Sequence, residues 1–98
     1  MEIVKTPVQD QLTVALSGRL DTSTAPELSA ALEGIDSVKT LIFDFKELEY
    51  VSSAGLRVLL STQKTMNSQG SMLVKNVNDS IMEVFEITGF SDIFTIEK

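Results

Sequence analysis

Two kinds of hydrophobic spacing alternate along the chain. Within residues 11–18, large apolar residues occupy every second position, which is the spacing of a strand with one buried face. Residues 24–34 and 53–68 repeat apolar positions every three or four residues, as amphipathic helices do. Lys39–Phe45 contains the unbroken run Leu41-Ile42-Phe43, which is typical of a strand buried on both faces. We therefore expect this strand in the centre of a sheet.

The expected elements are two strands followed by three helix–strand pairs. Strands joined through helices form a mainly parallel sheet, while the first two pair antiparallel as a hairpin. The expected fold is one α/β domain over residues 1–98, with helices packed on a mixed, mainly parallel β-β-α-β-α-β-α-β sheet. The expected strands are Glu2–Thr6 (ended by Pro7), Gln11–Gly18, Lys39–Phe45, Ser71–Val77 and a short one in Asp92–Glu97; the expected helices run from Thr24 to Gly34, from Ser53 to about Ser68, and from Asn78 or Ser80 to Gly89.

Capping residues and buried faces of the helices are also predicted. Thr24 with Glu27 three residues later forms a capping box, and either Asn78 or Ser80 caps the third helix, the latter with Glu83 as a second box. The expected buried faces are Leu28, Ala31, Leu32 and Ile35 in the first helix, Leu56, Leu59, Leu60, Gln63 and Met66 in the second, and Ile81, Val84, Phe85 and Thr88 in the third; Phe85, Phe90, Phe94, Met66, Met72 and Met82 are expected core residues.

Charge and composition narrow the classes of partner. The net charge is -6, and the eight basic residues are scattered singly, so phosphate backbones and anionic lipid headgroups are repelled. The chain has no cysteine for a disulfide or a thiolate site, and no apolar stretch of signal-peptide or membrane-spanning length. We therefore expect a cytoplasmic protein that neither binds nucleic acid nor inserts into a membrane.

Catalytic and metal chemistry find little support in the sequence. The absence of histidine excludes a Ser-His-Asp triad, and the chain has neither a Gly-x-Ser-x-Gly elbow nor a Gly-rich Lys-Ser/Thr phosphate loop. Asp44 with Glu47 or Glu49 is a candidate magnesium site, but acids at the end of a strand are more often simply solvated. We expect no enzymatic activity, no cofactor and no metal.

The segment Tyr50–Arg57 carries the most distinctive chemistry. Ser52 and Ser53 stand where a strand meets a helix, and backbone N–H groups at a helix start bind hydroxyl oxygens and favour negative charge. Gly55 lies in the first turn although glycine destabilises a helix by roughly 1 kcal/mol relative to alanine, so we expect it to leave the backbone open to a partner. On composition alone, a plain helix cap and a functional site both remain open.

Three motifs in this chain resemble those of one family. Tyr50–Leu60 is similar to the signature of STAS domains, which occur in anti-sigma factor antagonists and in the tails of sulphate transporters. In bacterial antagonists the signature is an aromatic or apolar residue, then Asp-Ser-Ser/Thr-Gly-Leu, then an apolar helix. Gly18-Arg19-Leu20-Asp21 and Ile87-Thr88-Gly89-Phe90 also resemble the family, as does the element order. The resemblance covers nearly the whole chain.

The resemblance implies a phosphorylation site and a partner surface. Ser53 matches the serine that partner-switching kinases phosphorylate, and Asp21 resembles an acid in a nearby loop. Two positions depart from the antagonist pattern, since Ser52 replaces the usual Asp and Ala54 replaces the second hydroxyl, which leaves Ser53 as the acceptor. The implied partner-binding residues are Asp21, Ser52, Ser53, Ala54, Gly55 and Arg57; for Arg57 a plain solvent-facing role is equally open.

The function implied by the family is that of an anti-sigma factor antagonist. Such a protein binds an anti-sigma factor that is also a serine kinase, is released when the kinase phosphorylates it, and is reset by a serine phosphatase. The alternative is a non-phosphorylated docking subunit of a lipid or solvent ABC transport complex, which the missing acid at Ser52 favours. A stressosome-like scaffold is a further alternative.

Overall fold

Five strands form one sheet in the order β1-β2-β3-β4-β5. The computed structural model describes residues 1–98. Its strands are β1 (Glu2–Val8), β2 (Gln11–Leu20), β3 (Thr40–Val51), β4 (Ser71–Lys75) and β5 (Thr95–Ile96), and its helices are α1 (Ala25–Ala31), α2 (Ser53–Asn67), α3 (Asp79–Thr88) and the short 3-10 turn η1 (Phe90–Asp92). No helix is long and apolar enough to cross a membrane.

The strand directions confirm the predicted mixed sheet. β1 pairs antiparallel with β2 as a hairpin, and the remaining neighbours pair in parallel with β3 in the centre. Pro7 does not end β1, because β1 is an edge strand and a missing N–H is tolerated there. Lys5, also in β1, turns its side chain toward the helices, where Nζ donates to the carbonyl of Ala31 at 3.1 Å.

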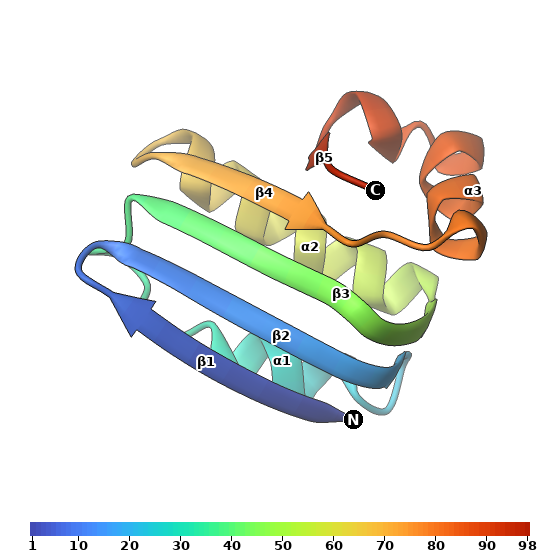
Figure 1. Cartoon of the computed structure of the whole chain (residues 1–98), viewed down its shortest axis with the longest axis horizontal. Coiled ribbons are helices and arrows are strands. Elements are labelled where there is room, and N and C mark those ends of the chain that lie inside the picture. Colours follow the sequence, from blue (N-terminus) through green and yellow to red (C-terminus); the bar gives the residue numbers. More distant parts are fainter.

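The helices α1 and α2, which connect β2 to β3 and β3 to β4, lie on one face of the sheet. Figure 1 shows α1 and α2 behind the strands, with no helix in front of them. Consecutive parallel strands in sequence order, joined by right-handed crossovers, place their helices on the same side. Leu41, Phe43 and Phe45 are accordingly fully buried, whereas Ile42 and Asp44 between them are only half-buried. The prediction that this strand is buried on both faces is therefore wrong.

β3 is longer than predicted and brings the two loops of interest together. It continues beyond Phe45 to Val51, and Val51 pairs with Leu20 at the end of β2 after two register shifts in that strand. The backbone N–H of Ser52 then donates to the carbonyl of Leu20 at 2.8 Å. Because the C-terminal ends of β2 and β3 are paired, the β2–α1 loop lies beside the start of α2.

Aromatic side chains link α3 and the C-terminal segment to the sheet. Successive ring centroids are 6.1 Å apart for Phe43–Phe45, 6.5 Å for Phe45–Phe85 and 5.5 Å for Phe85–Phe94, and Phe90 lies 5.6 Å from Phe94. Tilted aromatic pairs of this kind add about 0.5–1.5 kcal/mol beyond the burial of their area. The predicted core role is confirmed for Phe85 and Phe94, while Phe90 is half-buried against the core.

The helices differ in part from the predicted boundaries. α3 is capped by Asn78, whose Oδ1 accepts from the N–H of Ile81 at 2.8 Å, so the alternative box of Ser80 with Glu83 is not formed. α1 ends at Ala31, before Gly34, and β5 has two residues. The predicted buried faces hold at Leu28, Leu32, Leu56, Leu59, Gln63, Met66, Ile81 and Phe85, whereas Ala31, Ile35, Leu60 and Val84 are half-buried and Thr88 is exposed.

Candidate functional site

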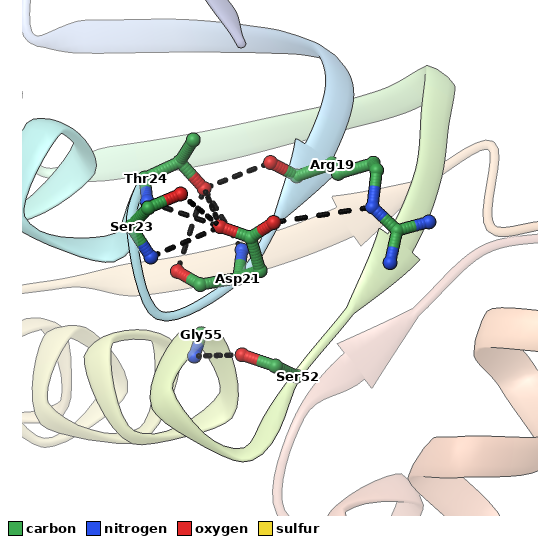
Figure 2. Close-up of polar contacts among 6 residues, drawn as sticks. All are labelled: Arg19, Asp21, Ser23, Thr24, Ser52 and Gly55. Atoms are coloured by element: carbon green, nitrogen blue, oxygen red, sulfur yellow. Dashed lines mark hydrogen bonds and ion pairs between the residues drawn. The ribbon is translucent and has the colours of Figure 1, made fainter.

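Asp21 organises the loop between β2 and α1. Its Oδ1 accepts hydrogen bonds from the N–H of Ser23 at 3.0 Å, the Ser23 hydroxyl at 2.8 Å and the N–H of Thr24 at 3.2 Å (Figure 2). The predicted capping box of Thr24 with Glu27 is wrong, because Thr24 has helical dihedrals and its hydroxyl donates to the carbonyl of Arg19 at 2.8 Å instead. Asp21 therefore supplies the acceptors at the start of this helix.

These donors also act on the acidity of Asp21. The hydrogen bond from the Ser23 hydroxyl, together with those from the Thr24 and Ser23 backbones, lowers the pKa of the Asp21 carboxyl below its ordinary 3.8, and outweighs the opposing effect of desolvation. Asp21 is therefore ionised at neutral pH. It places a fixed negative charge near the C-terminal ends of β2 and β3.

Arg19 and Tyr50 extend the site across the ends of β2 and β3. The Arg19 guanidinium carbon lies 4.2 Å from the centroid of the Tyr50 ring, and Arg19 Nε lies 3.9 Å from Asp21 Oδ2. Arg19 and Tyr50 are register partners in the parallel pair, which explains the stacking. Both residues lie within motifs of the sequence, but neither is among the predicted partner-binding residues, since their pairing depends on the strand register.

Ser52 and Ser53 have different roles at the start of α2. Ser52 is the cap: its backbone is extended and its Oγ accepts from the N–H of Gly55 at 3.3 Å (Figure 2). Ser53 is the first helical residue, and its side chain is exposed. Ser52 therefore acts as the helix cap, and the hydroxyl of Ser53 remains available for another role.

Gly55 has a structural role in place of the one predicted for it. It is buried, so it does not leave the backbone open to a partner. A Cβ at this position would lie 2.6 Å from Cγ of Leu20 and 3.1 Å from the Leu20 carbonyl oxygen. Glycine is therefore required because the first turn of α2 packs directly against the end of β2.

An open groove of about 610 Å³ lies between α1 and α2. Its walls are mostly apolar and hydroxyl side chains, among them Leu32 and Ile35 on one side and Ala54 and Val58 on the other. Arg57 is the one charged residue in the lining and is exposed. Ala54 and Arg57, two of the predicted partner-binding residues, therefore belong to the groove that begins next to Ser53.

Asp44, near the middle of β3, accepts hydrogen bonds from its own strand and from the residue that follows β4. Partial burial raises the pKa of Asp44, but hydrogen bonds from the Asn76 amide at 2.8 Å and the Lys46 N–H at 3.0 Å, with the charges of Lys75 and Lys46, lower it overall. No group of three or more His, Cys, Asp or Glu residues is arranged to hold a metal ion. Asp44 therefore connects β3 to the turn after β4.

The protein is thus an α/β module in which the polar β2–α1 loop, the exposed Ser53 and the groove between α1 and α2 lie near the C-terminal ends of β2 and β3. A model of the STAS domain matches residues 2–98. The anti-sigma-B factor antagonist of Listeria monocytogenes is 36% identical over 93 residues, which cover 91% of the chain and 81% of that relative. The chain belongs to the STAS domain family.

Solved structures agree with this assignment at the level of the fold. The anti-sigma factor antagonist SpoIIAA in its unphosphorylated form has a TM-score of 0.78 at 18% identity, over 99% of the chain and 87% of SpoIIAA. The phosphorylated form of SpoIIAA, a Bacillus cell fate determinant, has a TM-score of 0.77 at 18% identity, over 99% of the chain and 92% of SpoIIAA. The predicted STAS-like architecture is confirmed.

Proposed function

We propose that the chain is an anti-sigma factor antagonist that acts by binding in the cytoplasm and is controlled by phosphorylation of Ser53. The unphosphorylated form binds an anti-sigma factor that is also a serine kinase, and the phosphorylated form is released until a serine phosphatase resets it. The observation that carries the proposal is the exposed Ser53 hydroxyl at the first position of α2, beside a separate cap. The antagonist relative and the phosphorylated SpoIIAA structure support it.

The chemistry of the switch follows from the position of Ser53. The kinase transfers the γ-phosphoryl group of ATP to Ser53 Oγ; the hydroxyl proton passes to a base on the kinase and ADP leaves. The product gains roughly -1.5 to -2 charges and strong acceptor oxygens. Because a helix N-terminus favours an anion, the fold of this chain tolerates the phosphate.

The phosphate acts on the interface with the partner. A dianion next to the ionised Asp21 carboxylate must lose water when a partner covers this edge, and that weakens docking. A loss of ~3 kcal/mol in binding free energy lowers affinity on the order of a hundredfold, which is enough for a switch.

The test is a comparison of Ser53→Ala and Ser53→Glu with wild type. We expect wild type and Ser53→Ala to retain the anti-sigma factor kinase from native lysate, Ser53→Ala to accept no phosphate from it, and Ser53→Glu to lose it. Ser80→Glu is the matched control, because Ser80 is exposed in the first turn of α3. Normal phosphate incorporation into Ser53→Ala would show that the site is elsewhere.

The second candidate function is a permanent docking subunit of a lipid or solvent ABC transport complex. The observation that favours it is that Ser52, where antagonists usually have an acid, serves the structural role of a cap. In that case wild type and Ser53→Glu would both retain the same transporter subunits, and Ser53 would not be a switch.

A further inference from the structure

Ser53 and Arg57 lie four residues apart in α2. Side chains at this spacing share one face of a helix, with Cβ atoms about 5–6 Å apart, and an anion N-terminal to a cation is the favourable order. Both side chains are exposed, so neither is held by packing. A phosphate on Ser53 would therefore be within reach of the Arg57 guanidinium.

Arg57 is uncommitted in the unphosphorylated chain. The two ion pairs of the molecule are Arg19–Asp21 and Lys98–Asp79, and Arg57 is in neither. The groove between α1 and α2 that it lines contains no carboxylate to neutralise it. The guanidinium thus presents an unpaired positive charge at a groove of apolar and hydroxyl side chains, on a molecule whose net charge is -6.

That charge determines what the groove accepts. Apolar side chains such as Leu32, Ile35 and Val58 provide an area to bury, and the single cation provides the only ionic contact in the lining. An arginine fork binds carboxylates well, and arginines at the edge of apolar pockets are frequent anchors of protein interfaces. The complementary occupant is a segment of the partner protein that carries apolar side chains and one carboxylate.

We propose that Arg57 is a second means by which phosphorylation of Ser53 weakens binding, in addition to the desolvation of the phosphate. In the unphosphorylated chain, Arg57 pairs with a carboxylate of an apolar segment of the anti-sigma factor lying in the α1–α2 groove. In the phosphorylated chain, the Ser53 phosphate pairs with Arg57 within α2 and removes it from the partner. The inference rests on the proposed function and assigns it a second residue and a docking groove.

The intramolecular pair is tested without any partner. Phosphoserine is installed at position 53 during translation, and the phosphate is titrated by ³¹P NMR at low salt in wild type, Arg57→Gln and Lys64→Gln. Lys64 is the matched control, as an exposed base farther along the same helix. We expect the titration midpoint in wild type and Lys64→Gln to lie about 0.3 pH below that of Arg57→Gln, as an ion pair at this spacing implies. Equal midpoints in all three chains would overturn the pair.

The groove contact is tested by calorimetry with the purified anti-sigma factor that wild type retains. We expect Arg57→Gln to weaken binding of the unphosphorylated chain about tenfold, the effect of one interfacial ion pair, and Lys64→Gln to leave it unchanged. Phosphorylation should then reduce affinity by a smaller factor in Arg57→Gln than in wild type. Unchanged affinity of Arg57→Gln, with phosphorylation still abolishing binding, overturns this inference and leaves the proposed function standing. Equal affinity of the two forms of wild type overturns the proposed function itself.

Discussion

Asp21 shows how one side chain combines a structural and an electrostatic role. Its Oδ1 closes the β2–α1 loop through Ser23 and Thr24, and the same hydrogen bonds lower its pKa. The sequence motif Gly18–Asp21 predicts an acid at this position, but the hydrogen-bond donors around its carboxylate are set by the folded loop.

The lowered pKa of Asp21 gives a dependence of stability on pH. A carboxyl whose pKa is lower in the folded than in the unfolded chain stabilises the fold above the unfolded value, and this contribution is lost as pH falls through the folded value. We therefore expect Asp21→Asn to be less stable than wild type at neutral pH, and the gap to close below the ordinary value of 3.8. Urea denaturation from neutral pH to about pH 2 measures it. A gap that is constant with pH would mean that the charge of Asp21 plays no role.

The substitution Gly55→Ala has two opposing effects on stability, one from helix propensity and one from packing. Alanine is favoured in a helix by roughly 1 kcal/mol, but its Cβ would lie 2.6 Å from Cγ of the fully buried Leu20. Overpacking of this kind costs about 1–3 kcal/mol, so we expect a net destabilisation on the order of 1 kcal/mol in chemical denaturation.

A double-mutant cycle isolates that contact. In a Leu20→Ala background the contact with the Leu20 side chain is removed and only the 3.1 Å approach to the carbonyl oxygen of residue 20 remains, so Gly55→Ala should destabilise the protein less than it does in wild type. An equal loss in both backgrounds would place the cause elsewhere in the first turn.

At the scale of the element, helix caps were predicted with unequal success. Asn78 was one of two candidates and is correct, because its side chain acts locally on the next turn. The box of Thr24 with Glu27 failed because the Thr24 hydroxyl is bound by the carbonyl of Arg19, at the end of the preceding strand. A local pattern predicts a cap only when no neighbouring element competes for the same side chain.

The Asn78 cap leads to a second stability experiment. Asn78→Ala removes the acceptor for Ile81 N–H and a 3.1 Å hydrogen bond from Asn78 Nδ2 to the carbonyl of Leu48 in β3. We expect a loss of about 1–2 kcal/mol in the free energy of unfolding. Ser80→Ala, in the same turn, should change it by less than about 0.5 kcal/mol. Equal effects of the two substitutions would contradict the assignment of the cap.

At the scale of the molecule, the element order and mainly parallel sheet were predictable because both follow from short-range patterns. The one-sided arrangement of the helices was not, because the run Leu41-Ile42-Phe43 is equally apolar on both faces. The candidate site was predicted in part. The motif located Ser53 and Asp21, whereas the stacking of Arg19 on Tyr50 and the groove beside Arg57 depend on strand register and helix packing.

The separation of the Ser52 cap from Ser53 has a consequence for the stability of the whole fold. Because Ser53 is exposed at a helix start and Ser52 supplies the cap, we expect Ser53→Glu to shift the melting temperature by no more than about 3 °C. Calorimetric melting of wild type, Ser53→Glu and Ser52→Ala measures this, and only Ser52→Ala should be clearly lowered. A large fall in Ser53→Glu would mean that it loses partners by unfolding.

The two edge strands of the sheet determine whether this small protein can pair with strands of other chains. An exposed edge strand with free backbone groups invites pairing with other chains and aggregation. Here one edge is the two-residue β5, and the other carries Pro7 and Lys5, whose exposed side chain reaches across to the carbonyl of Ala31. The sheet therefore offers little template for an added strand. Association with other proteins is then left to side-chain surfaces, and in the proposed switch a single phosphate on Ser53 controls one of them.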